Sequence, residues 1–338
     1  MSVPPSRLIF GLIPWYGALI VLGAFLAILM ADREATRIRL PKDTAIDLAL
    51  RVLPIGILGA RIYYVLFSWK DFQSRPLSVF AIWEGGLAIY GGLIAGIGTV
   101  LVFCRRRKLS MLQMLDILAP GVALAQSIGR WGNYFNQEAY GIPVSAPSLQ
   151  FFPFAVQISE GGGLTWHAAT FFYESIGNLI ICLLLLFGRR RLFRRRGDVF
   201  GAYCLLYAAL RLWVENLRMD SLYLGGGIRV SQLFSILLCL TMLLTLTIRK
   251  GKSGREVNSP VLFTAILPLI PGLLCLFFCL GWTPSFLLSV PNQMLLLCGF
   301  SLLTVLAALI LYGRSVPSEV CYAHHESQKP DLPAGPAL

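Results

Sequence analysis

The chain has 338 residues, of which 56% are hydrophobic and 14% are charged, with a formal net charge of +12 and a mean hydropathy of +0.70. A soluble globular protein carries roughly 25% charged residues, so the composition excludes that class. Apolar stretches of about 20 residues recur along the whole chain, and this length crosses a bilayer core. The alternating segments of about ten residues that mark a transmembrane β-barrel are absent. The sequence therefore predicts an all-α polytopic membrane protein.

The apolar runs predict nine membrane spans, at 8–31, 46–67, 79–103, 111–128, 166–187, 199–215, 229–248, 261–281 and 293–313. The first run is too long for a signal-peptide core and lacks a small-residue cleavage site, so we interpret it as a retained span. The eight cysteines are scattered and lack the spacing of a disulfide framework or a zinc site. We therefore expect no metal, and we interpret the cysteines as small apolar packing residues.

Basic residues gather on one side of the nine predicted spans, in short runs at 33–42, 105–108, 189–196 and 249–255. By the positive-inside rule this side is cytoplasmic, which predicts an external N-terminus and a cytoplasmic C-terminus. We interpret these runs mainly as a topology signal, and secondarily as a source of attraction to anionic lipid on the cytoplasmic side. Because they are short loops without interleaved aromatic residues, we do not expect nucleic acid as a partner.

Charged side chains inside the predicted spans need an explanation, since each costs about 2.5–3.5 kcal/mol at membrane depth. In the second span, snorkelling alone does not explain Arg51 or the deeper Arg61 in "LGARIYYVLF". In the third span, "EGGLAIYGGLIAG" surrounds Tyr90 with glycines. Such glycines indicate either close helix packing or space for a bulky ligand beside Tyr90, and the sequence leaves both interpretations open.

The fourth span is followed by the most polar stretch of the chain, "SIGRWGNYFNQEAYG" at 127–141. The predicted external loop, residues 129–165, begins within it, so the stretch is expected at the outer membrane face. Its hydrogen-bonding side chains belong to Arg130, Asn133, Asn136, Gln137 and Glu138. A lipid-embedded protein has no structural need for so many such groups in one place, which favours a binding or catalytic site.

The fifth predicted span carries a polar stripe of His167, Thr170, Glu174 and Asn178, which helical spacing places on one face. A polar seam between helices and a functional surface explain this stripe equally well.

The sixth predicted span places Tyr207, Arg211, Glu215 and Arg218 on one face. An Arg211–Glu215 pair at i,i+4 would neutralise itself, but it would leave Arg218 unexplained. These groups predict an arginine-rich membrane cavity open near the outer leaflet. Because the planar guanidinium matches phosphate oxygens bidentately, we expect a phospholipid head group there. A transporter or flippase would use the same arginines only for binding, but the internal repeat often seen in transporters is missing from this sequence.

At this point the motifs resemble those of the prolipoprotein diacylglyceryl transferase family. The family signature is similar to "GRWGNYFNQEAYG", and the supporting matches within residues 8–250 are "WYG", "LGARIYYVLF", "GGLAIYGGLIAG", "FYES" and "GAYCLLYAALRLWVENLRMD". The resemblance implies transfer of the diacylglyceryl group of phosphatidylglycerol to the lipobox cysteine thiol of prolipoproteins, with release of glycerol phosphate. It places this reaction at the outer face of the bacterial plasma membrane and implies no cofactor.

The resemblance and the polar residues together predict the site. The expected catalytic residues are Arg130, Arg211, Tyr90 and Glu215. We expect Arg130 and Arg211 to stabilise the leaving phosphate, with Glu215 and Asn133 orienting them. The expected substrate-binding residues are Tyr16, Arg61, Asn133, Asn136, Glu138, His167 and Arg218.

Two departures from the family pattern bear on these predictions. The family's third-span motif often has a histidine, proposed as the base that activates the thiol, where this chain has Tyr90. A phenol is a weaker base at neutral pH than imidazole, so either Tyr90 or His167 is the candidate base. The family also typically has seven spans. We therefore predict a transferase-like core at 1–250, two additional spans within 251–313 and a cytoplasmic tail at 314–338.

Overall fold

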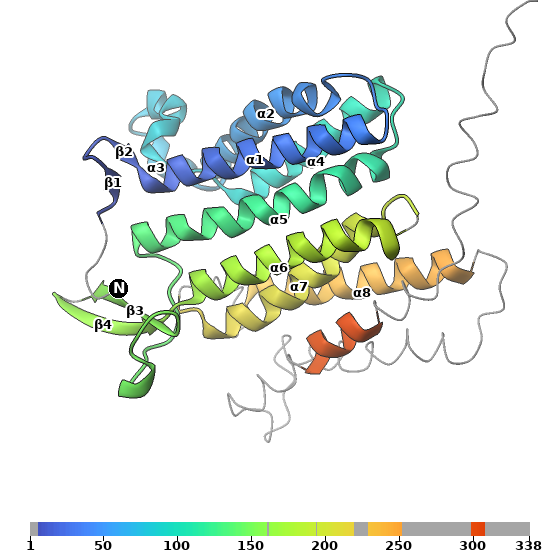
Figure 1. Ribbon diagram of the computed structural model, residues 1–338. Coiled ribbons are helices and arrows are strands. Elements are labelled where there is room, and N and C mark those ends of the chain that lie inside the picture. The colour runs from blue at the N-terminus through green and yellow to red at the C-terminus, as the bar shows by residue number, and fades with distance from the viewer. Residues whose placement is uncertain (1–5, 161, 194, 220–228, 252–298, 308–338) are drawn as a thin grey trace, which may run out of the picture. The chain divides into compact units, whose positions relative to one another are not determined.

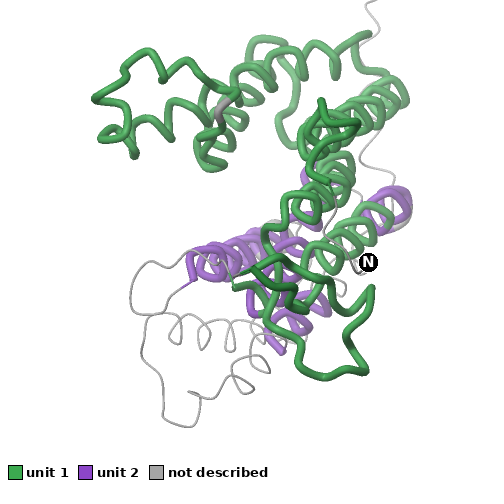
Figure 2. The backbone as a smooth tube through the Cα atoms, turned by 90° about the vertical axis from the view of Figure 1, so that its left-hand side faces the viewer, with its two compact units in different colours: residues 1–183, 217–220 green, residues 184–216, 221–338 purple. Residues whose placement is uncertain are grey.

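The computed structural model describes residues 6–160, 162–193, 195–219, 229–251 and 299–307. The chain forms two compact units, and each is described here by itself (Figure 2). The first comprises residues 1–183 and 217–220, and the second comprises residues 184–216 and 221–338. Among the described residues, helices dominate both units.

Four long helices build most of the first unit: α1 (Trp15–Arg37), α2 (Thr44–Phe67), α4 (Ile89–Arg106) and α5 (Met111–Asn136). α1 packs along α5, and α2 packs along α4 (Figure 1). Glycines permit the second contact, because a Cβ added to Gly59 would lie 2.8 Å from the Gly91 carbonyl oxygen. The close-packing interpretation of the glycine motif therefore holds for Gly91, and the space that a ligand would need is filled there by α2.

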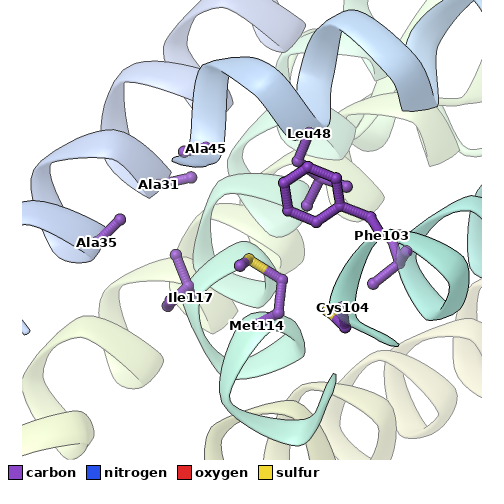
Figure 3. Close-up of a cluster of buried hydrophobic side chains, with 9 residues drawn as sticks. Ala31, Ala35, Ala45, Leu48, Phe103, Cys104, Met114 and Ile117 are labelled. Atoms are coloured by element: carbon purple, nitrogen blue, oxygen red, sulfur yellow. The ribbon is translucent and has the colours of Figure 1, made fainter. Parts of the chain in front are cut away.

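A buried cluster fastens these four helices together where they approach the basic loops (Figure 3). It combines small side chains from α1 and α2 with larger ones from α4 and α5. Its members are Ala31, Ala35, Ala45, Leu48, Val100, Phe103, Cys104, Met114 and Ile117. The buried Cys104 confirms the interpretation of this cysteine as a packing residue.

The first predicted span starts too early. Residues 8–14 form a small antiparallel hairpin of β1 (Leu8–Ile9) and β2 (Ile13–Pro14), and the helix begins only at Trp15. Gly11 lies between the strands with φ of 74°, a conformation that suits glycine and reverses the chain. Hydropathy alone could not separate this apolar hairpin from the helix that follows.

The third predicted span also starts too early, because residues 79–88 are not part of α4. This connection contains α3 (Trp69–Phe72) and two 3₁₀ turns, η1 (Pro76–Phe80) and η2 (Ile82–Glu84). Gly85 and Gly86 follow with φ of 90° and 66°, which an α-helix does not allow. The backbone carbonyls freed by this irregular path are satisfied by Arg61, as described below.

The fourth predicted span ends too early, since α5 continues to Asn136 and carries most of the polar motif on its last turns. The connection that was predicted to be external is therefore shorter than predicted. It contains η3 (Pro147–Leu149) and an antiparallel hairpin of β3 (Ala155–Glu160) and β4 (Gly163–Ala168). α6 (Thr170–Arg191) begins directly after β4, so the predicted start of the fifth span at residue 166 is wrong.

An aromatic cluster joins this hairpin to the last turns of α5 and the first turn of α6. Its buried members are Tyr134, Val156, Ile158, Ala169 and Phe171, and the rings of Trp131, Phe135, Phe152 and Phe172 surround them. Trp15 of α1 stacks on Phe135 with ring centroids 4.6 Å apart. The hairpin is thereby fixed beside the polar end of α5.

The second unit contains the rest of α6, most of α7 (Asp198–Leu217) and α8 (Val230–Gly251). The bounds of α7 and α8 agree with the predicted spans to within three residues. Residues 299–307 are helical and fall inside the ninth predicted span. The eighth, at 261–281, lies outside the described residues.

Four helices of the described part of the chain are long and apolar enough to cross a membrane: α1, α4, α5 and residues 170–190 of α6. Large apolar side chains such as Val21, Leu58 and Ile94 are exposed on helix surfaces, as expected for lipid-facing positions. Together these features identify a multi-pass helical membrane protein.

Candidate active site

The central feature of the candidate site is an ion pair between α5 and α6. Arg130 Nη2 donates a hydrogen bond of 2.6 Å to Glu174 Oε1. The Glu174 side chain is only 2% exposed, whereas 21% of the Arg130 side chain remains accessible. One turn earlier on α5, the Ser127 carbonyl accepts a 2.8 Å hydrogen bond from Ser175 Oγ. The two helices are thus fixed to each other at adjacent turns, and Arg130 is held by a buried carboxylate.

The amides of α5 connect Arg130 to a second carboxylate. Asn133 Oδ1 accepts from Arg130 Nη1 at 3.4 Å, and Asn133 Nδ2 donates to Glu138 Oε1 at 3.0 Å. Asn136 Nδ2 donates to the same Glu138 oxygen at 3.4 Å. Gln137 ends α5 in the left-handed conformation and turns the chain back, so that the Glu138 N–H bonds the Asn133 carbonyl at 3.0 Å. The structure therefore brings four of the predicted motif residues into one network.

Tyr16 joins this region from the first turn of α1. A Cβ added to Gly132 would lie 2.5 Å from Tyr16 Cδ2, so the glycine of the motif makes the close approach of the ring possible. The Tyr16 hydroxyl lies within electrostatic reach of Arg130 and Glu138. The structure thus places Tyr16 beside the Arg130 network, and its contribution to substrate binding stays a prediction.

Arg218 lies beyond the end of α7, so the predicted placement on the same helix face as Arg211 and Glu215 is wrong. Its backbone instead pairs with Gly141 in an isolated antiparallel bridge within the first unit. Gly141 must be small, because an added Cβ would lie 2.9 Å from the Leu217 carbonyl oxygen. The last glycine of the polar motif thus allows the close contact that holds the chain at Leu217 and Arg218.

His167 lies on β4 and not on a helix, which corrects the predicted helical stripe. Its buried ring contacts the Gly141 carbonyl through Nδ1 and Thr165 Oγ1 through Nε2, both at 2.9 Å. Since a carbonyl can only accept, Nδ1 carries the proton in the neutral ring, and Nε2 accepts from Thr165. Glu160 Oε2 lies 3.3 Å from Nε2. Both ring nitrogens are therefore engaged in holding the hairpin.

Arg61 is separated from this network by its own set of contacts. Its guanidinium donates to the backbone carbonyls of Ser78, Val79, Gly85 and Gly86 at distances between 2.5 and 3.1 Å. It also lies 5.2 Å from the ring centroid of Phe72. These contacts hold the irregular connection before α4, and a contribution of Arg61 to substrate binding stays a prediction.

Tyr90 lies half-buried in the first turn of α4. Its neighbour Gly91 faces α2, whereas the two preceding glycines shape the turn held by Arg61. The structure therefore places Tyr90 where the irregular connection enters the helix, in the same unit as Arg130.

The second unit contains the other predicted pair. Arg211 Nη2 lies 2.7 Å from Glu215 Oε2 on successive turns of α7, and the Glu215 side chain is buried. Arg229 donates from Nη1 to the Glu215 backbone carbonyl, and Gln232 Nε2 donates to Asn216 Oδ1 at 2.8 Å. The i,i+4 pair expected from the sequence is thus present, and the start of α8 braces the end of α7 beside it.

Glu174 is the residue that the predicted site lacked. The polar stripe of the fifth span and the "FYES" motif both contain it, and its spacing from Asn178 was the available signal. What the sequence could not reveal was its partner, because Arg130 lies 44 positions away. Among the described residues, no group of three or more histidine, cysteine, aspartate and glutamate side chains could hold a metal ion.

Comparison with known proteins shows the family of this chain. The family model for prolipoprotein diacylglyceryl transferase matches residues 7–248. A protein of Halalkalibacterium halodurans named phosphatidylglycerol–prolipoprotein diacylglyceryl transferase is 43% identical over 243 residues, which cover 70% of this chain and 83% of the relative. Proteins with the same name from Lactobacillus gasseri and Geobacillus kaustophilus are 46% and 43% identical over 247 residues, covering 88% and 91% of their own lengths. The matched region contains both arginine–glutamate pairs.

The buried ion pair leads to a test of stability. We expect Glu174→Gln to lower the free energy of unfolding by about 1–3 kcal/mol, because a neutral amide cannot compensate the guanidinium in a buried place. Thermal unfolding of the purified protein in detergent measures the change. Glu160→Gln serves as the control, since that carboxylate is exposed. A Glu174→Gln protein as stable as the control would contradict the structural importance of the pair.

Proposed function

Because the chain belongs to the prolipoprotein diacylglyceryl transferase family, we propose that it transfers the diacylglyceryl group of phosphatidylglycerol to the lipobox cysteine thiol of prolipoproteins. Its activity is thus that of a transferase acting in lipoprotein biosynthesis. The observation that carries the assignment to particular residues is the Arg130–Glu174 pair with its amide network. It places a fixed, partly accessible guanidinium at the polar end of two membrane helices.

The reaction needs one bond to form and one to break. The cysteine sulfur attacks the carbon of the diacylglyceryl group that is bonded to the phosphate oxygen, and a thioether forms. The bond between that carbon and the phosphate oxygen breaks, and its electron pair leaves with glycerol phosphate. The thiol proton must first pass to a base, since a free thiol is mostly protonated at neutral pH and the thiolate is the nucleophile.

Arg130 is suited to the charge that develops on the leaving phosphate. Its partners Glu174 and Asn133 fix the guanidinium before substrate arrives, so no reorganisation is needed during the reaction. The planar fork can still offer N–H groups to phosphate oxygens, because part of the side chain is accessible. In this proposal Asn136 and Glu138 bind the glycerol hydroxyls of the head group, and Tyr16 lines the same region.

Arg211 is proposed to act on the leaving phosphate as well, an assignment that rests on the family motif. The contact that supports it is the bond to buried Glu215, which orients Arg211 as Glu174 orients Arg130. A guanidinium has five N–H donors in a fixed planar arrangement, which suits the binding of phosphate oxygens. We assign Arg218 to substrate binding on the same motif.

The membrane arrangement forms part of the proposal. We infer nine spans in the bacterial plasma membrane, with an external N-terminus, a cytoplasmic C-terminus and the site towards the outer face. The basic runs at 105–108, 189–196 and 249–255 support this orientation. The four candidate membrane helices of the described residues support the multi-pass character. Phosphatidylglycerol would then enter from the bilayer, and the prolipoprotein would present its cysteine from the same leaflet.

The two arginines give the first functional test. We expect Arg130→Ala and Arg211→Ala each to lower turnover by about 10²–10³-fold, because each removes stabilisation of the leaving phosphate. Transfer from phosphatidylglycerol to a lipobox peptide in detergent measures turnover. Arg39→Ala, at the basic end of α1, is the matched control. Near-normal turnover by either variant, shown to be folded, would reject its proposed role.

The base is tested by two single substitutions. We favour Tyr90, because both ring nitrogens of His167 are engaged by the hairpin. Tyr90→Phe should then lower turnover by about 10²-fold or more, and Tyr90→His should retain much of it. If His167 is the base, His167→Ala is the damaging change and Tyr90→Phe is nearly silent. A fully active Tyr90→Phe enzyme would therefore contradict our assignment.

The segment after residue 250 is proposed to be an accessory module, because the family match ends at residue 248. A stop codon after Gly254 should leave an inserted seven-span protein with most of its activity. The new terminus follows a basic run and would stay cytoplasmic. Complete loss of transfer by a truncated protein shown to be inserted and folded would count against this division.

A further inference from the structure

The first unit contains a cavity that the transfer reaction does not use. It has a volume of about 590 Å³ and lies between α2 and α4, at the end of these helices that carries the basic loop 105–108. Its lining residues are Arg51, Ile55, Ala95, Gly98, Thr99, Val102, Phe103, Arg106 and Arg107. The Arg130 network lies at the other end of the bundle, on the last turns of α5. The cavity is therefore a separate feature of the fold.

Two of its arginines are held in place by Phe103 and Asp47. The guanidinium carbons of Arg51 and Arg107 lie 5.4 and 5.3 Å from the centroid of the same Phe103 ring. Arg107 also forms an ion pair with the Asp47 carboxylate, and Arg51 donates to the Asp47 backbone carbonyl at 2.6 Å. These contacts order both side chains at the cavity wall before any ligand binds.

The charge of the cavity is unbalanced. Three arginines line it, and the carboxylate of Asp47 compensates one of them, which leaves two positive charges. Arg106, on the last turn of α4, contributes one of these. A single phosphate group between Arg51 and Arg106 would match this excess, because guanidinium groups bind phosphate oxygens through paired N–H donors.

The remaining walls are apolar and continue onto the lipid-facing surface. By helical spacing, Leu58 and Ile62 lie on the same face of α2 as Arg51 and Ile55. Both of these side chains are more than half exposed, at 58% and 59%. A free phosphate ion would gain nothing from this surface, whereas the acyl chains of a phospholipid would cover it.

We propose that this cavity binds the phosphate of an anionic phospholipid, with the acyl chains lying along the exposed faces of α2 and α4. The site is distinct from the transfer site and does not depend on the proposed function. With the orientation proposed above, the lipid would belong to the cytoplasmic leaflet. The alternative without a ligand is that the arginines only determine membrane topology and complement the C-terminal dipole of α4. That alternative explains neither the cavity nor the position of Arg51 and Arg107 beside the same Phe103 ring.

Photocrosslinking of the full-length protein, followed by identification of the labelled peptides, tests the proposal. The probe is phosphatidic acid with a photoreactive group near its glycerol, which carries one phosphate and lacks the substrate's glycerol head group. We expect labelled peptides from α2 and α4 around the cavity. Arg51→Ala combined with Arg106→Ala should lower this labelling about tenfold. Arg105→Ala combined with Lys108→Ala removes the same charge from outside the cavity and should leave labelling unchanged.

A second variant keeps every arginine and fills the space. Gly98 lines the cavity and a Cβ added to it meets no atom within 4 Å, so we expect the Gly98→Leu side chain to occupy the space. It should lower labelling as the arginine variant does. Labelling that survives Gly98→Leu, or that falls equally in the Arg105→Ala/Lys108→Ala control, would overturn the proposal.

Two competition arms identify the ligand. Millimolar inorganic phosphate should not displace the lipid, and displacement would assign the cavity to a free anion instead. Phosphatidylcholine carrying the same photoreactive group should label the cavity weakly, because its choline cation opposes the arginines. Equal labelling by both lipids would show that the cavity is only an apolar groove, which also contradicts the proposal.

Discussion

The buried Arg130–Glu174 pair is the constraint on which the rest of the site depends. A guanidinium on a membrane helix is costly unless a partner compensates it, and a buried carboxylate is costlier still when it is alone. Each group therefore requires the other, and the two residues lie on different helices, 44 positions apart in the sequence. α5 must extend past residue 128 and α6 must start near residue 170 for these side chains to meet. The Ser127–Ser175 contact fixes the same register one turn away.

The connection between the two helices follows from this constraint. It must leave α5 at Asn136 and return to Thr170, and it does so through a hairpin instead of a loose loop. His167 ties the hairpin to Gly141, and Thr170 Oγ1 donates to the Ala139 carbonyl at 2.6 Å. The aromatic cluster around Tyr134 buries the hairpin's inner face. The polar motif is thus rigid at both ends, which suits groups that must be in place before substrate binds.

The sequence predicted the helices well where apolar periodicity continued to a helix end. α2 and α7 agree with their predicted spans to within about two residues, which is the usual uncertainty of such boundaries. The main errors occur at 8–14, 79–88, 129–136 and 166–169. In the first two segments an apolar chain is not α-helical, in the third a polar chain is, and in the fourth the chain belongs to β4 and the residue after it. Hydropathy measures side-chain polarity, whereas these ends depend on backbone hydrogen bonds and on partners distant in sequence. The network of Arg130, Asn133, Asn136 and Glu138 could be anticipated because these residues are neighbours in the chain, whereas the pairing of Arg130 with Glu174 could not, because it is a tertiary contact.

Arg61 and Arg130 show that two arginines on the helices of this fold can have different kinds of partner. Both lie on or next to predicted membrane spans, and their charge alone made both of them candidate site residues. Arg61 is buried, and its guanidinium donates hydrogen bonds to backbone carbonyls that would otherwise be unsatisfied in the irregular chain before α4. Arg130 is compensated by a carboxylate and an amide and remains partly accessible. The donors of Arg61 hold the chain in place, whereas Arg130 is oriented by a buried acid and stays partly accessible, which suits the phosphate-binding role proposed for it. The type of partner therefore distinguishes the two arginines where the residue type does not.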